Sequence, residues 1–301
     1  MQAGRTLNVL WATDGSAASR SAVPLLRELV LPVATRLTVL TVGPHPLFSH
    51  ARPDPGFLRK ATPAARRLAL AEARETAERE AMALDPSVPV EPIAAWGHPV
   101  QEILTAARRT KADLIVLAAK GHSDLRIALL GSVSDGVARL ATTPLLVARP
   151  GAAGPSRVVV GYHDSVASRR ALSFLTRLSL PASAEVVLVT AVEPLAVPDG
   201  TPAAARRRLL AEASGADARR REEAAKALEA LRAELEAGGR RVETEVAAGP
   251  AAEQIDQAAR RHRAGLIVVG SRRPAPGAQF SRGQTAERLV RHAHSSVLVV
   301  R

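Results

Sequence analysis

The chain alternates between two patterns of apolar and polar positions. Short segments that are apolar at nearly every position predict strands at Leu7–Ala12, Leu37–Val42, Val88–Ala94, Leu114–Ala118 and Pro144–Ala148. Between them, apolar residues recur every three or four positions, which predicts helices at Ala17–Leu29, Ala64–Leu84, Val100–Arg109 and Ser132–Leu140. Segments such as LIVLAA are typical of strands covered on both faces by helices. The pattern therefore predicts an open, doubly wound parallel sheet of the α/β, Rossmann-like class.

The pattern of the first strand and helix occurs again in the second half of the chain. The segment LNVLWATDGSAASRSAVPLLREL at residues 7–29 resembles RVVVGYHDSVASRRALSFLTRL at residues 157–178. This alignment matches Asp14 with Asp164, because each follows an apolar strand segment. An internal repeat of this kind indicates a duplicated fold.

A second pair of segments supports the duplication. GHPVQEILTAARRTKADLIVLAAKG at residues 97–121 resembles GPAAEQIDQAARRHRAGLIVVGSRR at residues 249–273. Between the two halves lies PGAAGPS, residues 150–156, whose composition is typical of a linker. A chain of 301 residues is long enough for two such cores. We therefore predict two homologous domains, 1–150 and 151–301.

The basic charge raises the question of a nucleic-acid partner. The chain carries 41 Lys and Arg against 29 Asp and Glu, a net charge of +12, but only 2% of its residues are aromatic. The low aromatic content argues against stacking on single strands, and many arginines lie on Ala-rich helical segments interleaved with Glu, as on solvated faces. We therefore expect no nucleic-acid partner.

The other compositional limits concern compartment and membrane. The chain has no cysteine, which excludes disulfides and thiolate chemistry. No apolar segment reaches the roughly 18 residues that cross a bilayer, and the first residues do not resemble a signal peptide. We expect a cytoplasmic protein without a membrane partner.

Polar residues follow two strands that we expect to be neighbours. Asp14 follows the first strand, and the fourth strand is followed by a loop that ends at Gly131 and opens a helix with Ser132 and Ser134. Unpaired amides at a helix N-terminus attract anions, and the two hydroxyls could donate to a phosphate chain. Asp14 could accept a hydrogen bond from an adenine amino group. This combination favours a nucleotide, although Asp14 and Gly131 also fit a simple helix cap, and Asp135 fits a residue that complements its own helix N-terminus.

These motifs resemble those of the universal stress protein family over nearly all of both halves. Nucleotide-binding members carry G-x2-G-x9-G-(S/T) after the fourth strand, and this chain reads Ala118-x2-Gly121-x9-Gly131-Ser132. The resemblance implies an ATP site, with or without Mg²⁺, in the first half. Its residues would be Thr13, Asp14, Val42, Ala118, Gly121, Gly131, Ser132, Val133 and Ser134. In this set Asp14 and Val42 would contact adenine, and the helix start would contact phosphate.

The second half departs from the motif. It reads Gly270-x2-Arg273-x9-Gly283-Gln284, and Ala286 stands where the first half has Ser134. Two hydroxyl donors and one glycine are therefore lost. We predict one nucleotide site, in the first half.

Three functions remain open at this point. The resemblance implies a nucleotide-binding regulatory protein of the stress response. A nucleotide-free scaffold that binds a protein partner and a slow ATP hydrolase are the alternatives. Rapid catalysis is not expected, because the sequence has no P-loop, no convincing zinc-ligand spacing and no nucleophile elbow. The resemblance also implies that the two halves pack as a pseudo-dimer through their final strands, and that whole chains pair as dimers.

Overall fold

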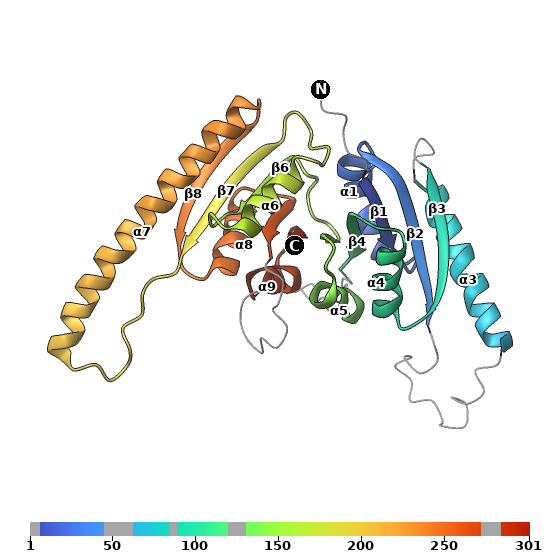
Figure 1. Cartoon of the computed structure of the whole chain (residues 1–301), viewed down its shortest axis with the longest axis horizontal. Coiled ribbons are helices and arrows are strands. Elements are labelled where there is room, and N and C mark those ends of the chain that lie inside the picture. Colours follow the sequence, from blue (N-terminus) through green and yellow to red (C-terminus); the bar gives the residue numbers. More distant parts are fainter. Residues whose placement is uncertain (1–6, 45–62, 85–88, 120–130, 272–283) are drawn as a thin grey trace.

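The fold is one continuous ten-stranded sheet with helices on both faces (Figure 1). The structure is a computed structural model, and it describes residues 7–44, 63–84, 89–119, 131–271 and 284–301. The strand order is β3-β2-β1-β4-β5-β10-β9-β6-β7-β8, so each half contributes five adjacent strands. The predicted doubly wound parallel α/β class is confirmed, and it occurs twice.

The elements of the first half follow the predicted alternation. Its strands are β1 (Leu7–Ala12), β2 (Ala34–Pro44), β3 (Val90–Gly97), β4 (Leu114–Ala118) and β5 (Leu145–Ala148). Its helices are η1 (Ser19–Ser21), α1 (Ala22–Leu25), η2 (Leu26–Val30), α3 (Pro63–Met82), α4 (Pro99–Arg109) and α5 (Ser132–Leu140). The strand predicted from Val88 begins at Val90, and Val88 itself lies outside the described residues.

The second half repeats this order. Its strands are β6 (Arg157–Gly161), β7 (Glu185–Val192), β8 (Arg241–Ala248), β9 (Leu266–Gly270) and β10 (Ser296–Val300). Its helices are α6 (Val166–Leu175), α7 (Ala203–Ala237), α8 (Ala251–Arg261) and α9 (Gln284–His292). In Figure 1, α7 lies along β7 and β8 and continues past the end of the sheet. Several of its exposed charges are paired within the helix, for example Arg208 with Glu212 at 3.1 Å and Lys226 with Glu222 at 2.7 Å, as on a solvated face.

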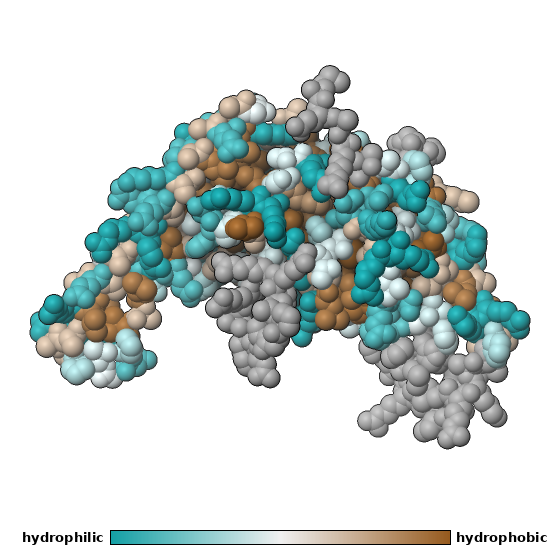
Figure 2. Space-filling model, viewed as in Figure 1, coloured by the Kyte–Doolittle hydropathy of each residue, from teal (hydrophilic) through white to brown (hydrophobic). Residues whose placement is uncertain are grey.

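Burial separates the two faces of the sheet into two apolar clusters. One cluster packs α1, α3, α6 and α7 against the sheet, with Trp11 and Leu188 among its fully buried members. The other packs α4, α5, α8 and α9 against the opposite face around Leu145 and Ile267. On the face shown in Figure 2, hydrophilic side chains are interspersed with apolar ones. No helix within the described ranges is long and apolar enough to cross a membrane.

The two halves join through their final strands. All pairs within each half are parallel, whereas β5 and β10 pair antiparallel, with Leu146 opposite Leu298. Both residues are fully buried, so the junction is part of the continuous core. This is the junction that the family resemblance implied for an intrachain pseudo-dimer.

The helix predicted at Ala17–Leu29 is irregular. It begins as the 3-10 turn η1, continues as the short α1 and ends as the π-helical η2. Pro24 has no amide hydrogen to donate, which disrupts the regular hydrogen-bond pattern at this place. Its counterpart α6 has Ser173 there and is a regular helix that starts at a capping box formed by Ser165 and Ser168.

Candidate functional site

The first-half candidate site lies at the carboxyl ends of β1 and β4. These strands are neighbours, with Trp11 opposite Val116, so Thr13 and Asp14 leave the sheet beside Ala118. Chain order reverses here, since β2 lies on one side of β1 and β4 on the other. In doubly wound sheets this is the place where ligands bind. The predicted Gly121 lies outside the described residues.

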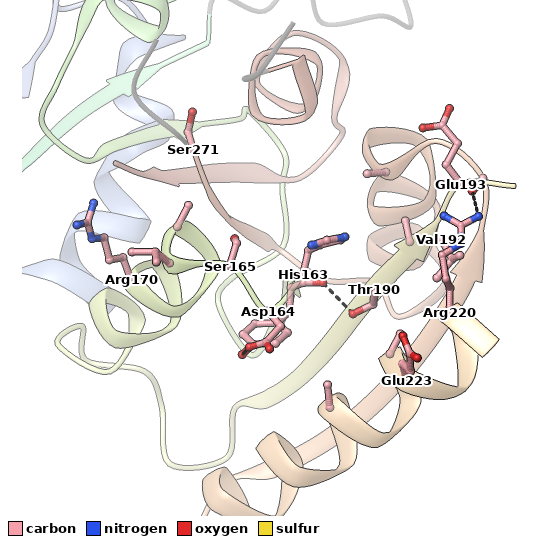
Figure 3. A pocket seen from close by; sticks show the side chains of 18 residues that line it. His163, Asp164, Ser165, Arg170, Thr190, Val192, Glu193, Arg220, Glu223 and Ser271 are labelled. Carbon is pink, nitrogen blue, oxygen red and sulfur yellow. Dashed lines mark hydrogen bonds between the residues drawn. The ribbon is translucent and has the colours of Figure 1, made fainter. Parts of the chain in front are cut away.

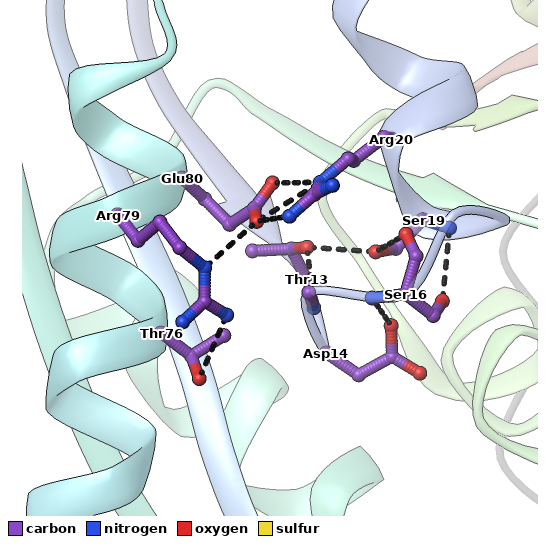
Figure 4. A network of polar contacts seen from close by, with 9 residues as sticks. Thr13, Asp14, Ser16, Ser19, Arg20, Thr76, Arg79 and Glu80 are labelled. Carbon is purple, nitrogen blue, oxygen red and sulfur yellow. Dashed lines mark hydrogen bonds and ion pairs between the residues drawn. The ribbon is translucent and has the colours of Figure 1, made fainter.

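The turn after β1 is held by its own hydroxyls (Figure 4). The Thr13 hydroxyl is 2.9 Å from the Ser19 hydroxyl and accepts a hydrogen bond from the Gly15 amide at 3.1 Å. The Ser16 amide donates to Asp14 Oδ1 at 3.0 Å. Thr13 is buried, so it shapes the turn, whereas the Asp14 side chain is exposed and can meet a ligand.

The Asp14 carboxylate is held in its charged form. Partial desolvation by surrounding protein atoms would raise its pKa, but hydrogen bonds from Ser16 and Ser19 outweigh desolvation and lower the pKa below its ordinary value. At neutral pH the group is therefore an acceptor with no proton to donate. The ionised state favours a hydrogen bond from an amino group, because a charged acceptor binds more strongly than a neutral one.

A buried carboxylate supports the turn from α3. Glu80 is 1% exposed and binds Arg20 through both oxygens, with distances of 2.7 to 3.1 Å. Arg79 approaches the same carboxylate at 3.8 Å. The pair fixes the first helical turn after Asp14 against α3. The sequence analysis missed Glu80. The arginine that occurs in both copies of the repeat, as Arg20 and Arg169, was a signal that an acidic partner exists.

Gly15 is required at its position for two reasons. Its φ of +74° lies in the left-handed region, and a Cβ there would lie 2.7 Å from the Thr76 methyl group of α3. The turn can therefore pass close to α3 only with glycine in this conformation.

The other side of the site is the N-terminus of α5. Gly131 is its N-cap in an extended conformation, and among the described residues no side chain caps the helix. Ser132 is exposed, Val133 is half-buried, and their amides belong to the first turn, whose amides have no partner within the helix. These groups could bind an anion.

Ser134 makes a hydrogen bond within the protein that we did not predict. Its side chain is buried, and its hydroxyl donates to the Ala118 carbonyl at 2.9 Å. In this structure the proton therefore holds α5 against the end of β4, and a contact of this hydroxyl with phosphate stays a prediction. Ala286 has no hydroxyl, so α9 lacks this link to β9.

The structure also explains why an alanine stands at position 118. A Cβ on Gly270, its counterpart, would lie 2.2 Å from the Ala167 carbonyl oxygen at the start of α6. In the first half the corresponding segment is not yet α-helical, since α1 begins only at Ala22. Position 118 therefore carries a methyl group in the half whose α-helix begins later, and its counterpart is glycine in the half whose α-helix begins earlier.

The predicted match between Asp14 and Asp164 is wrong by one residue. The Thr13 amide donates to Leu40 of β2, and the Tyr162 amide donates to Val189 at the same place in β7. Thr13 thus corresponds to Tyr162, and His163 occupies the position of Asp14. The sequence alignment matched the two Asp residues because they are identical and lie near the strand ends. It could not include the hydrogen-bond register of the strands, which only the structure gives.

Asp164 instead takes the position of Gly15. Its φ is +29°, and its carboxylate binds Arg169 at 2.6 Å and the Tyr162 hydroxyl at 3.0 Å. Arg169, and then Tyr162, lower the pKa of Asp164 below its ordinary value. Asp164 therefore replaces Glu80 as the partner of the repeated arginine, and it is not the structural counterpart of Asp14.

The second half has a cavity of about 1260 Å³ at the carboxyl ends of its strands (Figure 3). His163 and Thr190 line it from the strand ends, while Arg220 and Glu223 line it from α7. The Thr190 hydroxyl donates to the Tyr162 carbonyl at 2.8 Å. Because the amide of Ser168 is already bonded to the Ser165 hydroxyl, the start of α6 is less open to an anion than the start of α5.

Within the described residues, no group of three or more His, Asp and Glu side chains is arranged to hold a metal ion. Asp135 is paired with Arg139 at 3.0 Å and with Arg291 of the second half at 2.7 Å. It is therefore a structural carboxylate at the start of α5.

Family comparison identifies the class of protein. The model of the universal stress protein family matches residues 6–149 and again residues 155–301. The chain therefore belongs to the universal stress protein family, and it carries the family's domain in tandem.

Individual relatives agree with this assignment. Universal stress protein YxiE of Bacillus subtilis (strain 168) is 42% identical over 67 residues, which cover 22% of this chain and 45% of that protein. The chain thus spans less than half the length of this relative.

Two solved structures resemble the whole chain. A universal stress protein from Archaeoglobus fulgidus DSM 4304 is 21% identical with a TM-score of 0.65, covering 100% of this chain and 99% of that one. A protein of unknown function from Pseudomonas aeruginosa PAO1 is 17% identical with a TM-score of 0.62, covering 99% and 93%. They share its fold.

Proposed function

We propose that this universal stress protein binds ATP in its first half and acts as a regulatory protein of the stress response. The observation that carries the proposal is the pairing of two groups at neighbouring strand ends. An exposed, ionised Asp14 follows β1, and the open N-terminus of α5 follows β4. One accepts hydrogen bonds and the other attracts anions, which suits the two ends of an adenine nucleotide.

Each candidate residue then has a role. Asp14 accepts a hydrogen bond from the adenine amino group, and the backbone of Val42 contacts the base at the end of β2. Ser132 donates its hydroxyl to phosphate, together with the amides of the first turn of α5. Thr13 shapes the turn, and Ser134 holds α5 against Ala118.

We place the site in the first half because the second half lacks matching chemistry. His163 stands at the position of Asp14, and Gln284 stands at the position of Ser132. An imidazole can donate a hydrogen bond where a carboxylate cannot. The second-half cavity is therefore not expected to take ATP in the same way.

ATP in this role shifts an equilibrium between conformations or assemblies. A ligand does so only through different affinities for the two states. We assign no general base to the first-half site, so hydrolysis of ATP is expected to be slow or absent.

The first prediction compares two equivalent positions. Asp14→Ala should weaken ATP binding at least about tenfold, because a lost charge-assisted hydrogen bond contributes roughly 1.5–3 kcal/mol. His163→Ala is the matched control and should leave ATP affinity unchanged. Isothermal titration calorimetry with ATP and Mg²⁺ measures both affinities.

Wild-type protein provides the primary test. At a ligand concentration 100 times the dissociation constant, binding should stabilise the folded protein by about 2.7 kcal/mol. A flat thermal-shift response at millimolar ATP would contradict the proposal and favour a nucleotide-free scaffold. Equal losses in Asp14→Ala and His163→Ala would contradict the one-site assignment.

A further inference from the structure

The first-half helix α5 is bound to the second half through paired charges. α5 and α9 are in contact across the junction of the halves (Figure 1). Arg291 of α9 binds Asp135 of α5 at 2.7 Å, and Arg139 of α5 approaches Glu287 of α9 at 3.6 Å. Each helix also has its own internal pair, Asp135 with Arg139 and Glu287 with Arg291. The four groups form a charge cluster that spans the two halves.

The last strands add a second, reciprocal connection. Arg301, which follows β10, donates to the Ala138 carbonyl in the last turn of α5. Arg149, which follows β5, donates to the Val290 carbonyl in the last turn of α9. Carbonyls at a helix C-terminus have no partner within the helix and favour a cation. Each half therefore caps the C-terminus of the other half's helix.

The position of Asp135 gives the charge cluster its importance. Asp135 lies in the first turn of α5, where its amide bonds to the Gly131 carbonyl at 2.9 Å. A carboxylate there stabilises the helix when no ligand is bound, but it repels an anionic ligand at the same N-terminus. Arg291 compensates this negative charge from the second half, and Arg139 does so from within α5.

We infer that Arg291 is a positioning residue for the phosphate side of the first-half site, supplied by the second half. The inference rests on the proposed ATP site. Arg291 holds the first turn of α5 and offsets the charge of Asp135, while Arg301 holds the last turn. The second half thereby serves the site in the first half even though its own motif has diverged.

The test measures the affinities of the full chain for ATP and for adenosine by calorimetry. Arg291→Met should weaken ATP binding about fivefold, because Asp135 keeps only Arg139 as a partner, and should leave adenosine binding unchanged. Asp135→Asn in the Arg291→Met background should restore ATP affinity. Arg149→Met, which removes the cap of α9, is the matched control and should bind ATP as wild type does.

A second variant, which keeps both arginines, tests the inference if Arg291→Met does not fold. Asp135→Asn alone keeps both arginines and should bind ATP about twofold to fivefold more tightly, with adenosine affinity unchanged. Unchanged or weaker ATP binding by this variant would overturn the inference.

The remaining outcomes are also decisive. If Arg291→Met binds ATP as wild type does, or loses ATP and adenosine equally, Arg291 has no phosphate-directed role while the ATP site stands. A loss in Arg149→Met equal to that in Arg291→Met overturns the assignment to the first half. If wild type binds no ATP, the proposed function fails and the inference fails with it.

Discussion

At the scale of single residues, the two halves differ in the acidic partner of one arginine that occurs in both. Arg20 binds the buried Glu80 of α3, whereas Arg169 binds the exposed Asp164 of its own turn. Gly15, at the position of Asp164, leaves the first-half turn free of a competing carboxylate. The exchange leaves Asp14 as the exposed acid of the first-half turn.

This exchange predicts unequal effects of two equivalent substitutions. Arg20→Met should lower the melting temperature clearly, because it leaves Glu80 buried with Arg79 as its remaining cationic partner at 3.8 Å. Arg169→Met should lower it little, because Asp164 is 57% exposed and water replaces the arginine. Differential scanning calorimetry measures both. Equal shifts would contradict the difference in burial.

At the scale of elements, α5 combines an open N-terminus with a side-chain bond to β4. Ser132 and Ser134 are two residues apart, yet one is exposed at the helix start and the other is buried against Ala118. Helical periodicity places them on different sides of the helix. The Ser134 hydroxyl therefore holds the fold, and we propose that the exposed Ser132 hydroxyl is the one that meets a ligand.

The two serines should separate binding from stability. Ser134→Ala leaves the Ala118 carbonyl without its partner and should reduce the free energy of unfolding by about 1–2 kcal/mol, with ATP affinity changed little. Ser132→Ala should weaken ATP binding with almost no loss of stability. Chemical denaturation and calorimetry on both variants check this. Lost ATP binding with unchanged stability in Ser134→Ala would show that its hydroxyl contacts phosphate after all.

At the scale of the whole molecule, the ten-stranded sheet is continuous where the two halves meet, and its edge strands are β3 and β8. The antiparallel β5–β10 pair covers what would otherwise be an apolar edge in each half, including Leu145 and Val299. An uncovered apolar edge strand tends to pair with another chain. Because the linker joins the two halves, one chain covers both apolar edges. Two separate chains would have to associate to cover them.

Separating the halves tests whether the apolar β5 edge needs a partner strand. Residues 1–155 expressed alone should form a dimer through β5, because Leu146 lies close to the axis that relates the two halves and the strand can pair with its own copy. Size-exclusion chromatography with light scattering measures the mass. A stable monomer would show that the β5 edge does not need a partner.

The sequence by itself determined the local elements and the duplication. Apolar spacing is set by which face of a strand or helix is buried, so the strands and most helices of the first half could be predicted from that spacing. The repeated segments then predicted the second copy of the fold. The irregular helix at 19–30 was missed because the effect of Pro24 depends on how the following turns pack. Ser132 and Asp14 were predicted from their places after strands, and these two residues lie exposed at neighbouring strand ends.

Only the tertiary structure decided which groups act together. Arg20 and Glu80 are 60 residues apart, and Arg291 and Asp135 are 156 apart, so no local pattern links them. The register of β6 decided that His163, and not Asp164, matches Asp14. Packing of α5 against β4 decided that the Ser134 hydroxyl donates to the Ala118 carbonyl in this structure. Contacts of this kind depend on strand register and on the packing of distant segments, which residue spacing does not encode.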